Sequence, residues 1–165
     1  MILIALGANL PSEVGRPRAT LEAAIASLAQ EGGEIVARSR IYQSAPVPNS
    51  DQPNYLNAVV AIKTRLDPVS LLALLNRLEV RFGRQRGEPN AARPLDLDLI
   101  AYDDVIRDAP PVLPHPRMHE RAFVLLPMAE IAPGWRHPRL GLAIEELIRR
   151  LSAAERAGAR PVMAG

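Results

Sequence analysis

Two aspartates inside an apolar run have a spacing that could support chemistry. Asp96 and Asp98 lie within the segment RPLDLDLI. Side chains alternate between the two faces of a β-strand, so a strand here places both carboxylates on one face and the neighbouring leucines on the other. The leucine face can pack into a core. The opposite face then carries two carboxylates whose backbone positions are about 6.6 Å apart, from a rise of about 3.3 Å per residue.

Carboxylates at this spacing repel each other, so a partly buried pair needs positive compensation. A divalent cation is the simplest compensator, because Mg²⁺ takes carboxylate oxygens and shares its coordination shell with substrate phosphates. The alternative is a solvated strand face with two incidental acids, since alternating polar residues are common in half-exposed sheets. Spacing alone leaves both interpretations open.

Three arginines, Arg84, Arg86 and Arg93, precede the acid pair by a short distance. Guanidinium groups bind phosphate oxygens, and together with metal-binding carboxylates they form the kind of site that handles a nucleoside triphosphate. In the simpler alternative the arginines pair with the aspartates. The N-terminal segment GANLP does not follow the GxxxxGK[ST] pattern, so the sequence has no Walker-type phosphate loop there.

Five further side chains are candidates for ligand contacts. Glu79 lies on a predicted helix, where it could reach a ligand or pair with a helix neighbour. Tyr55 and Asn57 share a strand face, and an Asn side chain offers two donors and one acceptor to the edge of a flat heterocycle. Phe123 could stack on such a ring or belong to the core. His115, between two prolines, could donate to phosphate or cap a turn.

The composition is that of a globular protein. The chain has 165 residues, of which 48% are apolar, and this fits one domain with a real core. It contains no cysteine, which excludes a disulfide framework and a thiolate site. The N-terminus does not resemble a signal peptide, and no stretch approaches a membrane span, so we expect a cytoplasmic protein. A net charge of +2 and 4% aromatic residues give little support to a nucleic-acid partner.

Hydrophobic periodicity predicts an α/β protein. We expect strands at residues 1–6, 34–43, 55–64 and 95–102, and helices that begin at residues 17 and 68. The resulting order is β-α-β-β-α-β, the ferredoxin-like arrangement with an antiparallel sheet. A turn at residues 7–9 follows the first strand. Additional C-terminal helices are expected near residues 119–131 and 142–154. Residues 1–157 then form a single domain, and residues 158–165 form a frayed tail.

Five segments of the sequence resemble 6-hydroxymethyl-7,8-dihydropterin pyrophosphokinase of folate biosynthesis. In order they are LGANL, DQPNYLNAVVAIKT, LEVRFGRQR, RPLDLDLIAYDD and LPHPRMHERAFVLLPMAEIAP, and they span roughly residues 2–135. The resemblance implies a ferredoxin-like fold, ATP as co-substrate and two magnesium ions. The implied reaction moves the pyrophosphoryl group of ATP to the hydroxymethyl oxygen of the pterin and releases AMP.

The resemblance also implies roles for individual residues. The implied magnesium ligands are Asp96 and Asp98, and the implied catalytic arginines are Arg84 and Arg93. The implied ATP contacts are Leu72, Glu79, Arg84, Arg86, Arg93, Leu99, His115 and Arg121. The implied pterin contacts are Gly7, Ser44, Val47, Tyr55, Asn57 and Phe123, with Phe123 stacked on the ring. Family members often carry Trp-Gly-Pro-Arg before the acid strand, where this chain has Ala91-Ala92-Arg93.

Two other classes of function compete with this interpretation. A nucleic-acid-binding ferredoxin-like module would need exposed aromatic residues on its sheet, and the first and last strands of this core show no such pair. A small regulatory domain would bind a metabolite without turnover. An assay of AMP release from ATP and hydroxymethyldihydropterin separates the three. We expect a monomer that binds small molecules and has neither a nucleic-acid nor a membrane partner.

The polar segment at residues 84–92 generates the first prediction. It contains Gly87 and Pro89, and few of its side chains can be buried. We expect it to become ordered when nucleotide and pterin bind, because its arginines then gain phosphate oxygens as partners. Amide hydrogen exchange across residues 84–92, with and without an unreactive ATP analogue plus pterin, measures this. High protection in the free protein would contradict the prediction.

Overall fold

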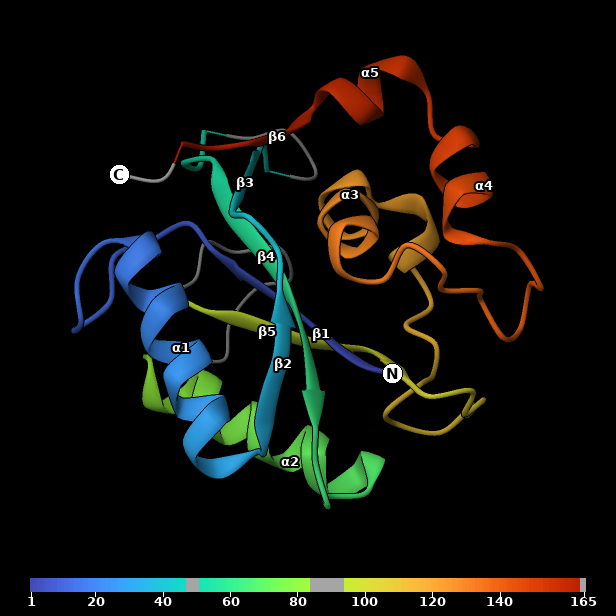
Figure 1. Ribbon diagram of the computed structural model, residues 1–165. Coiled ribbons are helices and arrows are strands. Elements are labelled where there is room, and N and C mark those ends of the chain that lie inside the picture. The colour runs from blue at the N-terminus through green and yellow to red at the C-terminus, as the bar shows by residue number, and fades with distance from the viewer. Residues whose placement is uncertain (47–50, 84–93, 164–165) are drawn as a thin grey trace.

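The computed structural model describes residues 1–46, 51–83 and 94–163. In chain order its elements are β1 (Ile2–Ala8), α1 (Pro17–Glu31), β2 (Glu34–Arg38), β3 (Tyr42–Ser44), β4 (Tyr55–Lys63), α2 (Pro68–Arg81), β5 (Asp96–Tyr102), the 3₁₀ turn η1 (Met118–Glu120), α3 (Ala122–Ile131), α4 (Ile144–Arg149), α5 (Ala153–Ala157) and β6 (Ala159–Pro161). Helices cover both faces of the sheet, α1 and α2 on one side and α3 and α4 on the other (Figure 1).

The sheet is antiparallel and follows the order β5-β1-β4-β3-β6 within the described residues, with β2 also paired to β4. Strand β1 therefore lies between β4 and β5. The four strands β5, β1, β4 and β2, together with α1 and α2, give the β-α-β-β-α-β arrangement of a ferredoxin-like core. The predicted fold class is confirmed.

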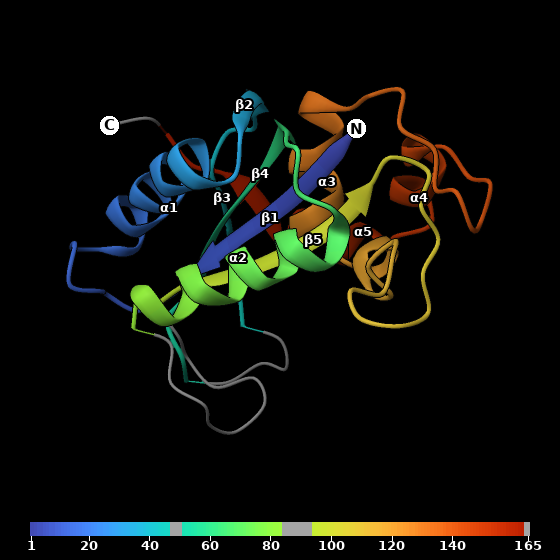
Figure 2. The same cartoon turned by 90° about the horizontal axis from the view of Figure 1, so that it is seen from below.

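Strand β1 is buried on both of its faces. Ile4 and Leu6 belong to the core between the sheet and helices α1 and α2, whereas Leu3 belongs to the core beneath α3 and α4. Figure 2 shows α2 running along the sheet beside β1 and β5, with α3 beyond the sheet. Two-sided burial explains why the sequence of β1 is a continuous apolar run. Each fully buried Leu or Ile contributes about 1.5–3 kcal/mol of transfer free energy.

Strand β5 follows the predicted alternation. Leu95, Leu97 and Leu99 are buried in the core that faces α1 and α2, while Asp96 and Asp98 are only partly buried on the opposite face. The sequence pattern therefore gave the correct orientation of the acid pair.

Two expected strand boundaries are wrong. The predicted strand at residues 34–43 divides into β2 and β3, because the Ser39 hydroxyl accepts the Val59 N–H at 2.9 Å and donates to the Arg40 carbonyl at 2.7 Å. This side chain interrupts the regular backbone ladder. The turn expected at residues 7–9 is also wrong, since Gly7 and Ala8 still pair with β4.

The C-terminal part differs more from expectation. The helix predicted at residues 142–154 divides into α4 and α5, because Ser152 and Glu155 form a capping box that begins a new helix. The helix expected from residue 119 begins only at Ala122, after the turn η1.

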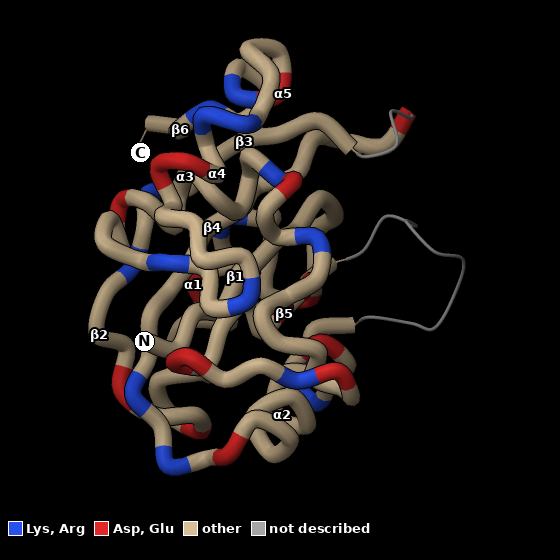
Figure 3. The backbone as a smooth tube through the Cα atoms, turned by 90° about the vertical axis from the view of Figure 1, so that its right-hand side faces the viewer, with Lys and Arg blue, Asp and Glu red and all other residues tan. Residues whose placement is uncertain are grey.

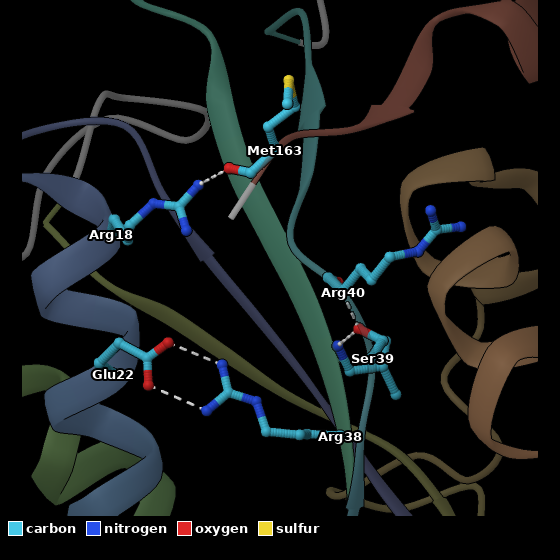
Figure 4. A network of polar contacts seen from close by, with 7 residues as sticks. Arg18, Glu22, Arg38, Ser39, Arg40 and Met163 are labelled. Atoms are coloured by element: carbon cyan, nitrogen blue, oxygen red, sulfur yellow. Dashed lines mark hydrogen bonds and ion pairs between the residues drawn. The ribbon is translucent and has the colours of Figure 1, made fainter. Parts of the chain in front are cut away.

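The expectation of a frayed tail is wrong for residues 159–161. Strand β6 pairs with β3, and the Val162 N–H donates to the Ile41 carbonyl at 2.8 Å. The Arg18 guanidinium of α1 holds the Met163 carbonyl at 2.8 Å (Figure 4). The C-terminal segment is therefore fixed to both the sheet and a helix.

Basic and acidic positions are interspersed along the backbone in the view of Figure 3. None of the helices in the described ranges is both long enough and apolar enough to cross a membrane.

Candidate active site

Three strands form a floor on which the predicted residues meet. In the register of the sheet, Gly7 of β1 lies opposite Asp96 of β5 on one side and opposite Asn57 of β4 on the other. Ala5 likewise lies opposite Asp98. The absence of a side chain at Gly7 matters here, because a Cβ atom would lie 3.3 Å from the Asn57 Oδ1 atom. The central strand thus leaves an open space between the carboxylates and the amide.

A pocket lies over this floor, with walls from β3 and from the start of α3. Its lining residues are Ala5, Leu6, Gly7, Ser44, Ala45, Pro46, Gln52, Tyr55, Asn57, Asp96, Asp98, Arg121, Phe123 and Val124. The structure therefore brings together the predicted metal ligands, the predicted pterin residues of the described ranges, and Arg121. Sequence reasoning missed the others. Ala5 could have been predicted from the sequence, because it shares a strand face with Gly7.

Hydrogen bonds fix the polar wall of the pocket. Asn57 is buried, and its Nδ2 atom donates to the Ser44 hydroxyl at 2.8 Å. Asn9 donates to the Gln52 side-chain oxygen at 3.1 Å and to the Pro53 carbonyl at 3.2 Å, which fixes the segment that carries Gln52. A buried amide held in one orientation can read the donor and acceptor pattern of a ligand.

The positive charge of Arg121 lies at the apolar wall. Its guanidinium carbon is 5.5 Å from the centre of the Phe123 ring, within the range of a cation–π contact. Arg121 itself has an extended backbone and immediately precedes α3. This places a cation beside the aromatic ring and in the same pocket as the two aspartates.

Glu79 occupies the other side of the acid strand. It is 5% exposed, and one of its carboxylate oxygens accepts the Leu97 N–H at 2.9 Å. Glu79 therefore contacts the backbone between Asp96 and Asp98 from the helix side of β5. Leu72 of α2 is partly buried and Leu99 is a core residue, and neither lines the pocket.

Four predicted site residues lie outside the described residues. They are Val47, Arg84, Arg86 and Arg93. Their expected contacts stay predictions.

His115 lies close to the acid pair but lines a second hollow, between the segment around Pro114 and residues 137–140. Its Nδ1 atom accepts the Arg117 N–H at 3.2 Å, so the proton of the neutral ring is on Nε2. Burial, followed by the charge of Arg121, lowers the pKa of His115 to about 4, although the Asp96 carboxylate acts in the opposite direction. His115 therefore caps a turn and can still donate a neutral hydrogen bond through Nε2.

The donor set fits a magnesium ion shared with a phosphate ligand. Within residues 1–46, 51–83 and 94–163, no group of three or more His, Asp or Glu side chains converges as a complete metal site. Asp96 and Asp98 offer carboxylate oxygens to the pocket from one strand face. Mg²⁺ is commonly held by one or two carboxylates, with water and substrate phosphates in its remaining positions.

A ferredoxin-like fold that carries two carboxylates beside an aromatic- and amide-lined pocket is typical of an enzyme that acts on small molecules. Residues 3–133 match the model of the 7,8-dihydro-6-hydroxymethylpterin-pyrophosphokinase (HPPK) family. The chain belongs to this family of enzymes, which carries out the pyrophosphokinase step of folate biosynthesis with ATP as co-substrate.

Individual relatives agree with this assignment. The chain is 40% identical over 150 residues to the 2-amino-4-hydroxy-6-hydroxymethyldihydropteridine pyrophosphokinase of Synechocystis, covering 90% of this chain and 75% of that protein. It is 39% identical over 150 residues to the Haemophilus influenzae protein of the same name, covering 90% of this chain and 91% of that one.

A Plasmodium falciparum HPPK-DHPS structure superimposes with a TM-score of 0.76 at 13% identity. The match covers 99% of this chain and 47% of that one, so it supports the fold alone.

The state of His115 leads to a prediction about pH. An unfolded histidine takes up a proton near pH 6.5, whereas folded His115 does so near pH 4. Between these values the unfolded state binds more protons, so the free energy of unfolding falls as the pH is lowered through this window. In a His115→Gln variant this fall should be smaller. Urea unfolding of both proteins at pH 7 and pH 5 measures this fall. If the free energy of unfolding falls equally in the two proteins, the low pKa of His115 is contradicted.

Proposed function

We propose that this chain transfers the pyrophosphoryl group of ATP to 6-hydroxymethyl-7,8-dihydropterin in the pocket over β1. The observation that carries the proposal is the row formed by Asp96, Gly7 and Asn57 across three neighbouring strands. In this row the acid pair and the buried amide lie on opposite sides of one opening, which supports a phosphate on the acid side and a ring on the amide side. Membership of the HPPK family supports the choice of both substrates.

The pterin binds on the β4 side of the pocket. Asn57 reads the polar edge of the ring, because its amide is buried and held by Ser44. Phe123 and Tyr55, which come from different elements of the pocket wall, enclose the ring faces. In this orientation the hydroxymethyl group points toward β5 and the two aspartates.

ATP binds on the β5 side. Asp96 and Asp98 would hold magnesium there, and we propose two ions, which would neutralise charge on the phosphates. Arg121 neutralises phosphate charge, and the Nε2–H of His115 donates a hydrogen bond to a phosphate oxygen. We retain Arg84, Arg86 and Arg93 as proposed nucleotide contacts, with Arg84 and Arg93 stabilising the charge that develops on the transferred group.

The reaction forms a bond from the hydroxymethyl oxygen to the β-phosphorus and breaks the bond from that phosphorus to the oxygen shared with the α-phosphate. AMP leaves with the electron pair, and the hydroxyl proton passes to a carboxylate of Asp96 or Asp98 or to solvent. Bound magnesium supplies charge neutralisation on the triphosphate. The residues of this chain orient the two substrates in line, which is the main protein contribution in such transfers.

The acid pair generates a prediction for turnover. Asp96→Asn and Asp98→Asn should each lower kcat by about 10²-fold or more, because each removes a charge aimed at the reacting phosphates. AMP release at saturating magnesium measures kcat. Asp104→Asn is the matched control, since Asp104 is an exposed carboxylate in the turn after β5. Turnover near that of the unmodified chain in either test variant would contradict the role of the pair.

Asn57 generates a prediction for binding. Asn57→Ala should weaken pterin binding about 5- to 150-fold, because a lost buried hydrogen-bond partner costs about 1–3 kcal/mol. The dissociation constant of an unreactive ATP analogue alone should not change. Ligand titration measures both constants. Gln43→Ala is the control, since Gln43 is exposed on the neighbouring strand β3. Equal losses for the two ligands would make Asn57 a structural residue.

A further inference from the structure

A partly exposed carboxylate joins helix α3 to the segment that leads into strand β3. Glu130 of α3 accepts the Arg40 backbone N–H at 2.9 Å and the Arg40 Nε–H at 3.0 Å. It also accepts a short hydrogen bond from the Tyr42 hydroxyl, and Tyr42 is 5% exposed. Glu130 therefore holds three donors from the residues at the start of β3.

The same two elements carry opposite walls of the pocket. Phe123 and Glu130 are seven residues apart on α3, which places them on one face of the helix about 10.5 Å apart along its axis. Tyr42 and Ser44 are two residues apart on β3, on one face and about 6.6 Å apart. The contact of Glu130 with Tyr42 thus connects, further along, the same two elements that carry Phe123 and Ser44 in the pocket lining.

The internal structure of α3 makes an external support necessary. Pro127 lies inside the helix between Phe123 and Glu130. Proline has no N–H, so the Phe123 carbonyl lacks the intrahelical hydrogen bond that would otherwise fix the first turn of α3. The orientation of that turn then depends on how the rest of the helix is held against the sheet.

The ionisation states of Tyr42 and Glu130 favour this hydrogen bond at neutral pH. Burial, together with the hydrogen bond to Glu130, raises the pKa of Tyr42 to about 12, so its hydroxyl keeps its proton. Burial alone would raise the pKa of Glu130, but the hydrogen bonds from Tyr42 and Arg40 outweigh it and lower that pKa. At neutral pH the donor and the acceptor are therefore both in the required state.

We propose that Glu130 is a positioning residue that sets the distance between Phe123 and the Asn57–Ser44 pair, and so adapts the pocket to a flat bicyclic ring. Glu130 itself does not line the pocket and touches no substrate. The inference rests on the proposed function, because it assumes that this pocket holds the pterin.

Two nearly isosteric variants test the proposal. Glu130→Gln removes the charge, and Tyr42→Phe removes a single hydroxyl. We expect Glu130→Gln to weaken pterin binding about tenfold and Tyr42→Phe to weaken it less, at the scale of one net hydrogen bond. The dissociation constant of the ATP analogue alone and kcat at saturating pterin should stay close to those of the unmodified chain. The double variant should bind pterin about as weakly as Glu130→Gln alone, because both changes break one contact.

A matched control separates positioning from general stability. Glu22 of α1 makes a bidentate ion pair with Arg38 of β2, at 2.7 and 2.9 Å. Figure 4 shows Arg38 directed toward α1, and Arg40 extending to the other side of the strand. Glu22→Gln should lower the melting temperature without changing pterin affinity. If it weakens pterin binding as much as Glu130→Gln does, Glu130 has only a structural role.

The outcomes also distinguish this inference from the proposed function. If Asn57→Ala weakens pterin binding and Glu130→Gln does not, the positioning role fails while the pocket assignment stands. If Asn57→Ala leaves pterin affinity unchanged, the pocket assignment itself fails.

Discussion

Backbone hydrogen bonds from β1 to both of its neighbours hold the acidic pair and the asparagine at fixed positions on either side of Gly7. Adjacent strands lie about 4.8 Å apart, so the backbones at Asp96 and Asn57 are separated by roughly 10 Å. Neither residue can approach the other without breaking the sheet. The backbone separation between the acid pair and Asn57 is therefore a property of the fold rather than of flexible side chains.

The register of these strands is strongly specified. A slip of one residue in β5 would move Asp96 and Asp98 into the core and expose the leucines between them. Such a slip would leave two charges without solvent, which costs far more than the fold can tolerate. Glu79 adds a specific restraint, because its carboxylate binds the N–H of Leu97 between the two acids. Packing on one face of β5 thus determines where the two carboxylates lie on the other.

Local periodicity explains which parts of this structure were predictable. The alternation in β5, the face shared by Tyr55 and Asn57, and the order of the first six core elements all follow from patterns within single segments. The residue roles came from resemblance, and the structure brings many of them into one pocket. The burial of Glu79 could also be predicted locally, because Glu79 comes four residues after Leu75 and so lies on the same buried face of α2.

Non-local pairings explain what was missed. Strand β6 has three residues and ends in Pro161, and it is held by pairing with β3 and by the burial of Ala159, so its sequence carries no strand pattern. The Glu130–Tyr42 contact joins residues 88 positions apart. The break between β2 and β3 depends on one hydroxyl group of Ser39 that meets the backbone of another strand.

Strand β5 lies at the edge of the described sheet, so the acid pair also affects whether this edge can pair with another molecule. An edge strand rich in leucine presents unpaired backbone groups that can recruit the same strand of another molecule. Here Glu79 occupies the N–H of Leu97, and the charges at Asp96 and Asp98 would repel an identical strand approaching in register. The carboxylates that we propose to serve the reaction would thereby also oppose self-association. Neutralising the two aspartates would remove this repulsion and leave the strand edge less protected against pairing with another molecule.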